Sequence, residues 1–433
     1  MKNLSIALAL IAGASSLLQP RAALAQAIPA VSPTEVPPVA GWNELVDSLR
    51  TLPQRMLAKL PENLRNDPQI RQEVARLALE GLTSQGLDTL AADGDHPLFL
   101  PTIGQVLNIG QPNADTIYRS ARITPGGIYR LRGDRGTYRL AVISESGPRP
   151  AQVPGKPINL GPQPEVHYLS RVPVDAQGRF DVIFSPTRPA GYTGTWWPLS
   201  PTSNHLLLRL VSSDWAKERA PTLSIERVDT PVARPRPGAA DLEVRLRALP
   251  ASIDFIAPLL VDHVEQLRAE GYVNRLKITD FAQMGGLKGQ YYYEGAYDLA
   301  DDEALIVSAK APAHCLYRSI ILTNEIYETT DWVNNHSSLN DAQAALDRDG
   351  VLRVVISAKD PGVPNWLDTA GNPHGAIQGR WTECDAKPIP EVAKVKLAEL
   401  RLYLPKETPV VTPEQRDRTL RDRRAAQLQR PLW

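Results

Sequence analysis

The sequence predicts an α+β protein with more strand than helix, built from jelly-roll or β-sandwich-like domains with helical subdomains. Proline is abundant, at 39 residues, while phenylalanine occurs only 5 times. This composition favours a loop-rich, β-containing protein over a helical bundle. Short β-prone runs are separated by Gly, Pro and Asp clusters without long helices between them, which is typical of a sandwich rather than of βαβ units. A chain of 433 residues also exceeds one ordinary core and predicts two or three domains.

The first residues predict export. Lys2 gives a positive start, residues 4–18 are mostly apolar, and Ala23-Leu24-Ala25 is a small-residue cleavage site, so residues 1–25 are expected to be a cleavable signal peptide. The apolar run is too short to span a bilayer, and no later stretch is long and apolar enough to do so. The mature protein is therefore expected to be soluble and periplasmic or secreted.

Changes of composition and periodicity divide the rest of the chain. Pro250 is expected to separate two helices, and the basic tail is expected to be a solvated helix. No internal repeat is evident in the sequence. The predicted segments are a Pro-rich lead-in at 26–40, a helical subdomain at 41–100, a β-rich domain at 101–230, a linker at 231–240, a helical segment and connection at 241–300, a β-rich C-terminal domain at 301–405 and the basic tail helix at 406–433.

Charge and cysteine content limit the classes of function that are compatible with the sequence. Lys and Arg number 48 and so do Asp and Glu, which argues against a nucleic-acid-binding protein driven by phosphate attraction. The two cysteines, Cys315 and Cys384, are predicted to form a disulfide in an oxidising compartment. The alternative is two buried thiols that act as small apolar side chains.

The loop at 360–375 is the segment richest in chemical groups. Asp368 and His374 could transfer protons, Trp366 could stack on a ring, and Asn365 could offer an amide. The structural alternative is a long β–β connection in which polar side chains cap the backbone and Trp366 fills the core below.

Two further segments, 111–121 and 331–340, combine amides, acids and aromatic residues. Here too the alternative is that Asn and Asp cap turns. A cleft walled by residues 331–340 and 360–374 is the expected site. Beyond the 360–375 loop, His336 is the third catalytic candidate, and the remaining substrate-binding candidates are Arg380, which could hold an anionic group, Asn340, Asn113, Asp115, Tyr118 and Arg119.

No cofactor or metal site is predicted. The sequence lacks H-E-x-x-H, paired C-x-x-C, G-x-S-x-G, Walker and G-x-G-x-x-G motifs. The seven histidines are scattered, and a zinc site formed by His314, His336 and His374 remains the alternative. The doublet Trp196-Trp197 could be a sugar-stacking platform or packing under a loop.

Three blocks carry a family resemblance: Pro112-Asn113-Ala114-Asp115-Thr116-Ile117-Tyr118, Val333-Asn334-Asn335-His336 with Ser338-Leu339-Asn340, and Asp360-Pro361-Gly362-x-Pro364-Asn365-Trp366-Leu367-Asp368-Thr369-Ala370-Gly371. They resemble bacterial proteins with domain of unknown function 1214, which often follows domain of unknown function 1254. The resemblance covers about 107–145 and 313–383. It implies a β-rich fold of jelly-roll character, and it implies no settled reaction and no catalytic residue.

These observations lead to one functional hypothesis with two alternatives. The leading hypothesis is a cofactor-independent hydrolase or lyase that acts on a polar small molecule or a carbohydrate-like ligand. The alternatives are a non-catalytic periplasmic ligand-binding protein and an envelope structural protein. An enzyme requires a carboxylate and an imidazole that converge in a pocket, whereas a binding protein requires only aromatic faces and hydrogen-bonding groups.

Overall fold

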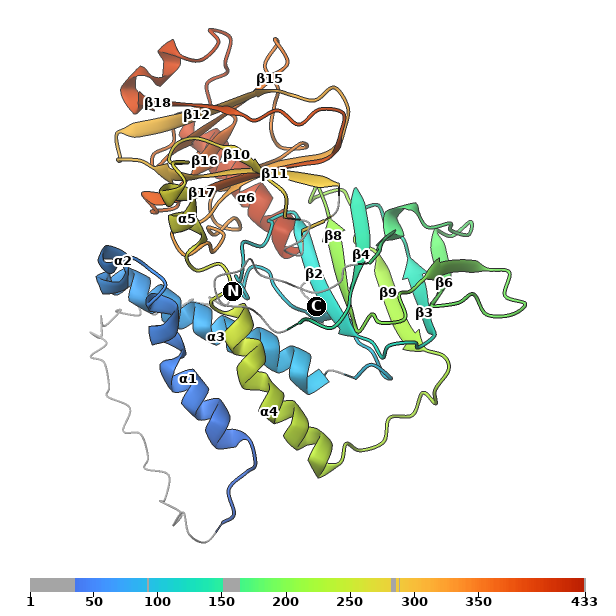
Figure 1. Cartoon of the computed structure of the whole chain (residues 1–433). Helices are drawn as coiled ribbons and strands as arrows, with labels where there is room; N and C mark the ends of the chain where they lie inside the picture. Colours follow the sequence, from blue (N-terminus) through green and yellow to red (C-terminus); the bar gives the residue numbers. More distant parts are fainter. Residues whose placement is uncertain (1–35, 92, 151–163, 282–285, 288, 432–433) are drawn as a thin grey trace, which may run out of the picture. The chain divides into compact units, whose positions relative to one another are not determined.

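The computed structural model confirms the predicted α+β fold class, with more strand than helix and mostly antiparallel sheets (Figure 1). No helix among the described residues is long and apolar enough to cross a membrane. The predicted signal peptide and most of the lead-in lie outside the described residues, which are 36–91, 93–150, 164–281, 286–287 and 289–431.

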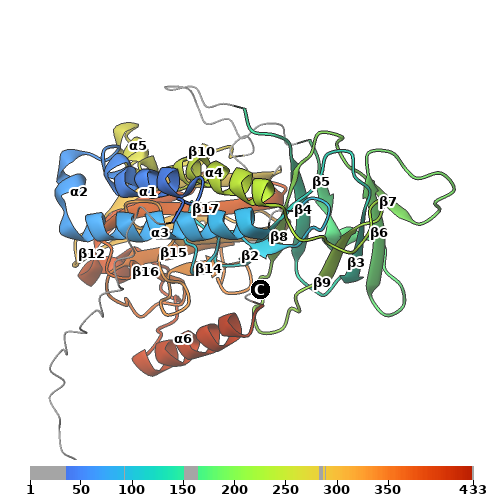
Figure 2. The same ribbon diagram turned by 90° about the horizontal axis from the view of Figure 1, so that it is seen from below.

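The predicted helical subdomain at 41–100 contains three helices, which pack with α4 (Ala239–Ile256) (Figures 1 and 2). The Asp67 carboxylate accepts hydrogen bonds from the N–H groups of Gln69 and Ile70, which caps the third helix where Pro68 occupies its first turn. Apolar side chains, among them Leu52, Met56, Val74 and Ile253, are buried between these helices. The three helices are α1 (Trp42–Leu57), α2 (Glu62–Asn66) and α3 (Pro68–Ala91).

The first β-sandwich consists of a five-stranded sheet, in the order β1-β2-β8-β4-β5, and a four-stranded sheet, β7-β6-β3-β9. Its core includes Leu131, Ile143, Phe184 and Leu208. Its strands are β1 (Leu100–Pro101), β2 (Thr116–Arg122), β3 (Tyr129–Asp134), β4 (Leu140–Ser146), β5 (Val166–Tyr168), β6 (Arg179–Ser185), β7 (Thr195–Pro198), β8 (His205–Val211) and β9 (Thr222–Arg227).

The second β-sandwich pairs the sheet β10-β11-β17-β13-β14 with the sheet β16-β15-β12-β18. Its core includes Tyr293, Leu305, Ile377 and Trp381. Its strands are β10 (Lys277–Thr279), β11 (Gln290–Asp298), β12 (Glu303–Lys310), β13 (Cys315–Leu322), β14 (Ser338–Asn340), β15 (Val351–Ser357), β16 (Trp366–Asp368), β17 (His374–Cys384) and β18 (Glu391–Lys396).

The two sandwiches have the same topology, so the chain contains a repeat that the sequence does not reveal. Adding nine to each strand number of the first sandwich gives the strand order of the second. In both, one edge pair is parallel: β6–β7 in the first and β15–β16 in the second. Even a detail repeats, because the indole of Trp196 donates to Ser185 Oγ, as the indole of Trp366 does to Ser357 Oγ. The repeat conserves strand pairing while most side chains differ, which is why the sequence alone does not show it.

Two expectations for the segment 241–300 need correction. Pro250 does not separate two helices, since α4 runs through it. The helix α5 (His263–Ala269) is short, and β10 and β11 follow within the same segment. The second sandwich therefore begins before residue 301. The aromatic run Tyr291-Tyr292-Tyr293 is the sequence signal for β11, because aromatic residues favour strands.

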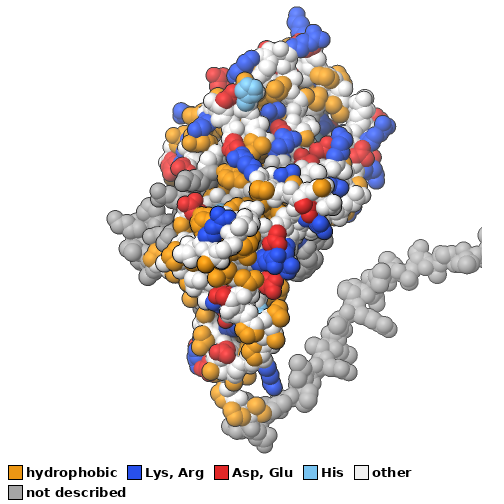
Figure 3. Space-filling model, turned by 90° about the vertical axis from the view of Figure 1, so that its right-hand side faces the viewer, with side chains coloured by type: hydrophobic (Ala, Val, Ile, Leu, Met, Phe, Trp, Pro, Cys, Tyr) orange, Lys and Arg blue, Asp and Glu red, His pale blue; other side chains and the backbone are white. Residues whose placement is uncertain are grey.

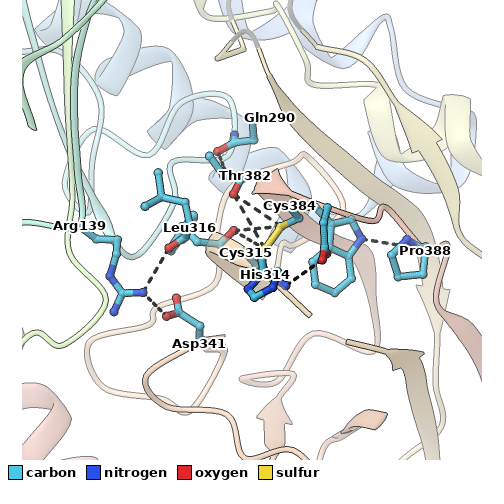
Figure 4. Close-up of a disulfide and its surroundings, with 12 residues drawn as sticks. Arg139, Gln290, His314, Cys315, Leu316, Asp341, Thr382, Cys384 and Pro388 are labelled. Carbon is cyan, nitrogen blue, oxygen red and sulfur yellow. Dashed lines mark hydrogen bonds and ion pairs between the residues drawn. A yellow bond between two sulfur atoms is a disulfide. The ribbon is translucent and has the colours of Figure 1, made fainter. Parts of the chain in front are cut away.

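Cys315 and Cys384 form a disulfide between β13 and β17 (Figure 4). The two residues lie directly opposite each other, with a Cα–Cα distance of 4.0 Å. Nearby, Arg139 of the first sandwich donates to Leu316 O (3.2 Å) and to the Asp341 carboxylate (2.6 Å). The disulfide thus closes the end of the sheet at a place where the two sandwiches are in contact.

The tail helix, α6 (Pro413–Leu428), is not simply solvated. Arg416, Arg423 and Arg430, spaced by seven residues, are all buried. Seven residues make about two helical turns, so such residues share one face of a helix. Arg416 donates to Val363 O, Arg423 to Ser338 O, and Arg430, just after the helix, to Ala114 O. The tail therefore binds both sandwiches, on the side away from α1 and α4 (Figure 2).

Glu80 on α3 should make stability depend on pH. Burial, and then the charge of Glu328, raises the pKa of Glu80 from 4.5 to about 7. The folded state therefore favours the protonated form. That contribution is complete below pH 4.5 and is lost as pH rises through about 7.

We expect Glu80→Gln, which cannot ionise and can still accept the Asn108 N–H, to raise the Tm by about 2–5 °C at about pH 8. The same variant should change the Tm little near pH 4.5. Thermal unfolding followed by circular dichroism measures both values, with Glu62→Gln on the exposed surface of α2 as the control. An equal shift at both pH values would contradict the assigned pKa.

Candidate functional site

The main candidate site is a cavity of about 360 Å³ between the two five-stranded sheets. The strands β2, β4 and β8 line one side, β11 and β17 line the other, and residues of α3 and α4 complete the wall. Figure 3 shows that acidic and basic side chains are interspersed on one outer face of the molecule. The cavity differs from that surface, because four arginines line it: Arg122, Arg149, Arg209 and Arg380.

Strand alternation explains how each sheet supplies both a core and a cavity wall. On β8, His205, Leu207 and Arg209 line the cavity, while Leu206 and Leu208 are buried in the sandwich core. Successive side chains of a strand point to opposite faces of its sheet, so this division is a direct result of the period of two. The same holds on β17, where Gln378 and Arg380 face the cavity and Ile377 and Trp381 face the core.

Arg380 is the central polar group of the cavity. Its side chain is only 3% exposed, and its Nη2 donates to the side-chain oxygens of Gln111 and Gln378, both at 2.7 Å. Among the described residues, no carboxylate pairs with this guanidinium, and its Nη1 has no hydrogen-bond partner. A buried charge without a counter-charge is costly. Arg380 is therefore a buried cation with one donor that has no partner among the described residues.

Gln111 supplies a second unfilled donor beside Arg380. It is 4% exposed, and its Nε2 has no partner among the described residues. The backbone of Gln111 has φ 60°, next to Gly110 at φ 65°. A left-handed conformation is unfavourable for a residue other than Gly and is found most often where function requires it. The local backbone is thus strained at the residue whose amide oxygen accepts from Arg380.

A hydrogen-bond chain fixes the amide of Gln378. Its Nε2 donates to the hydroxyl of Tyr327 (2.5 Å), and that hydroxyl donates to Glu294 Oε2 at 3.3 Å. The imidazole of His263 lies 3.0 Å from the same carboxylate oxygen. Because the amide nitrogen is engaged by Tyr327, the amide oxygen of Gln378 is left to accept from Arg380. The guanidinium is therefore held in one orientation by Gln111 and Gln378.

Arg209 enters the cavity from the first sandwich. It is 9% exposed, and its Nη1 donates to Ser144 Oγ at 2.9 Å. Burial lowers the pKa of Arg209, and the hydroxyls of Tyr292 and Tyr118 oppose that effect. Arginine remains charged at neutral pH even so.

The opposite end of the cavity carries a second polar group. Arg122 makes a bidentate ion pair with Asp88, from Nε to Oδ1 at 3.2 Å and from Nη2 to Oδ2 at 2.5 Å. The guanidinium of Arg149 lies 4.2 Å from the ring centre of Phe255. Burial, followed by the charge of Arg122, lowers the pKa of His205 to about 4. This histidine is therefore neutral at physiological pH.

The cavity also has an apolar wall. It is formed by the loop after β1, by α4 and the residues that follow it, and by the loop after β10, and its side chains are Ile103, Phe255, Ile256, Leu259, Leu260 and Phe281. Small-molecule pockets are commonly built in this way, with mostly apolar walls and a few placed polar groups.

The structure places the residues predicted from the sequence in several different surroundings. Arg380 and Tyr118 line the cavity. Arg119, the neighbour of Tyr118 on β2, does not; its Nε has no partner among the described residues, and burial lowers its pKa. Gln111 and Arg209 were not singled out from the sequence, although a single arginine in the apolar strand HLLLRLV is a signal that could have identified Arg209.

Asn113, Asp115 and Asn340 form a hydrogen-bonded cluster between the sandwiches, away from the cavity. The Asp115 carboxylate accepts from the indole of Trp215 (2.8 Å), from Asn340 Nδ2 (2.7 Å) and from the hydroxyl of Tyr317 (2.6 Å). Asn113 Nδ2 donates to the same hydroxyl at 2.7 Å. Asp115 is 1% exposed, and burial raises its pKa. Together these contacts join the loop before β2 to β13 and β14.

The three catalytic candidates do not line the cavity. The Asp368 N–H donates to His336 O at 3.0 Å, but the imidazole of His336 is buried and lies 2.5 Å from Trp366 O. The imidazole of His374 lies 2.8 Å from Asp298 and is 42% exposed. Burial raises the pKa of Asp368, and its carboxylate accepts from the Ala370 N–H. The structure thus places the backbone of His336 beside the backbone of Asp368. The side chains of Asp368 and His374 have different partners among the described residues.

Asn365 and Trp366 make the contacts that the structural alternative requires. Asn365 Nδ2 donates to Ala345 O (2.7 Å) and to Arg353 O (2.9 Å), which fastens two loops to each other. Trp366 is 5% exposed, and its indole donates to Ser357. Among the described residues, no group of three or more His, Cys, Asp or Glu side chains could hold a metal ion.

Comparison with known proteins shows a shared fold. No protein-family model and no curated protein match this chain. The chain is similar to the crystal structure of an uncharacterised protein from Burkholderia cenocepacia, with a TM-score of 0.74 and 27% identity, covering 83% of this chain and 97% of that one. A structure from Vibrio parahaemolyticus matches with a TM-score of 0.43 and 13% identity over 75% of this chain and 99% of that one, and nothing is inferred from it.

Proposed function

We propose that this protein binds a small organic anion in the cavity between its two sandwiches. The proposal rests on two buried donors, Arg380 Nη1 and Gln111 Nε2, which have no hydrogen-bond partner among the described residues. A carboxylate would satisfy both donors and would compensate the buried charge, because guanidinium and carboxylate groups match in geometry and form strong charge-assisted hydrogen bonds. The apolar wall around Phe255 and Leu259 would take the hydrocarbon part of the ligand.

This proposal selects the ligand-binding alternative over the hydrolase or lyase hypothesis. Asp368 and His374, the acid and base of that hypothesis, do not line the cavity. A hydroxyl and an imidazole that do line it, those of Ser146 and His205, lie 3.4 Å apart. The hydrogen bonds and ion pairs of the described residues give this imidazole no carboxylate partner, which a catalytic triad requires. Carbohydrate is also less suited to the site than an anion, because the central donors belong to a cationic group. Membership of the family with domain of unknown function 1214 stays a prediction.

Export remains part of the proposal. The N-terminal pattern predicts cleavage after Ala25, and the Cys315–Cys384 disulfide fits an oxidising compartment. N-terminal sequencing of the protein recovered outside the cytoplasm tests this. A mature chain that begins near Gln26 supports export, and a chain that retains Met1 argues against it.

Calorimetric titration with hexanoate and with benzoate tests the anion site, with hexanamide and benzamide as neutral controls of the same size. We expect the acids to bind and the amides to bind at least tenfold more weakly. Arg380→Gln should weaken acid binding by about 10- to 100-fold, as expected for the loss of a charge-assisted pair. Arg132→Gln, at an exposed ion pair with Glu226, is the matched control and should change nothing. Equal binding of acids and amides, or by the Arg380→Gln variant, would exclude an anion site at Arg380.

A further inference from the structure

The duplicated fold places two equivalent arginine–tyrosine pairs at the cavity. In the first sandwich, Tyr118 of β2 lies directly opposite Arg209 of β8. In the second, Tyr292 of β11 lies directly opposite Arg380 of β17. The strands β2 and β8 occupy the same positions in their sheet as β11 and β17 in theirs. The two pairs are therefore the same structural feature, present once in each half of the chain.

Both pairs face the same space. All four side chains line the cavity, and Tyr118 and Tyr292 each act electrostatically on both guanidinium groups. The ring of Tyr292 also lies 5.3 Å from the guanidinium carbon of Arg380. The cavity thus has an approximate two-fold design, in which each sandwich contributes one buried cation and one phenol.

The charges of the described lining residues are not balanced. They include four arginines and only two acidic residues, Asp88 and Glu145. Asp88 pairs with Arg122. Glu145 is already bound by His167 and by the hydroxyl of Ser203. His205 is neutral at physiological pH, as shown above. By formal charge the lining therefore has at least two more cationic than acidic side chains, and a single carboxylate would not compensate them all.

We infer that the ligand is a short-chain dicarboxylate. This inference rests on the proposed anion site and adds the class of ligand. One carboxylate would bind Arg380 and Gln111, and the other would bind on the side of Arg209, with the methylene chain along the apolar wall. The competing arrangement is a monocarboxylate held by both arginines.

The test uses the full-length mature protein and five diacids, from succinate to suberate, each compared with its own monomethyl ester. The ester keeps one carboxylate and the chain length but removes the second charge. Calorimetric titration should show at least one diacid that binds about 10- to 100-fold more tightly than its ester. Arg209→Gln should remove that difference, while Arg380→Gln should weaken diacid and ester alike. Arg132→Gln serves again as the control.

The outcomes separate the two proposals. If esters and diacids bind equally well and both depend on Arg380, the anion site stands and the dicarboxylate inference fails. If no diacid or ester binds in a manner that depends on Arg380, both proposals fail. If Arg209→Gln does not fold, the comparison of diacid with ester on the unmodified protein still decides the inference, because it does not require that variant.

Discussion

Replacement of Asp115 with alanine should lower the free energy of unfolding by about 3–5 kcal/mol. The change removes the acceptor of the Trp215 indole and of the Tyr317 hydroxyl, and one of the two acceptors of the Asn340 amide, at a position that is only 1% exposed. Each unsatisfied buried donor costs about 1–3 kcal/mol. Loss of one partner from a buried charged network costs a similar total. Urea denaturation followed by circular dichroism measures the change.

Two further substitutions sharpen this test. Asp115→Asn keeps the shape but replaces one acceptor oxygen with an NH₂ group, so we expect an intermediate loss of about 1–3 kcal/mol. Asp302→Ala removes a carboxylate that is 68% exposed and should change stability by less than about 0.5 kcal/mol. An Asp115→Ala protein as stable as the Asp302→Ala control would show that the cluster does not hold the sandwiches together.

The fold class follows from local patterns, and so it could be predicted. Turn-forming residues and short alternating strands are visible in the sequence, and strand alternation divides β8 and β17 into a core face and a cavity face. The duplication and the start of the second sandwich were not predicted, because strand order depends on pairing between distant segments. The prediction that Pro250 separates two helices was wrong for a similar reason, because tertiary packing stabilises α4 on both sides of this proline.

The lining of the candidate cavity was predicted only in part. Arg380 and Tyr118 were identified as binding residues from polar segments of the sequence, and both line the cavity. Gln111 and Arg209 become significant only when the two sandwiches bring their sheets face to face. The segments richest in amides and acids proved to contain residues that bond to the backbone or to each other, such as Asn365 and Asp115. Segments rich in amides and acids therefore included residues that join structural elements as well as residues that line the candidate cavity.

Trp366→Ala is expected to cost about 3–5 kcal/mol, the usual range for removal of a large buried aromatic side chain. The ring lies in a cluster with Ile306, Val355 and Val363, and its indole N–H donates to Ser357. The substitution would leave a cavity beneath the 360–375 loop and would remove the hydrogen bonds that the indole donates to Ser357. Urea denaturation measures the loss.

Two other tryptophans provide graded controls for this prediction. Trp196 occupies the equivalent position in the first sandwich but is only partly buried, so Trp196→Ala should cost less. Trp42 is 53% exposed, so Trp42→Ala should cost less than about 0.5 kcal/mol. Anion binding by the folded Trp366→Ala protein should be unchanged, because Trp366 does not line the cavity. A Trp366→Ala protein with normal stability and no ligand binding would instead make this tryptophan a stacking platform and would return the binding site to the 360–375 loop.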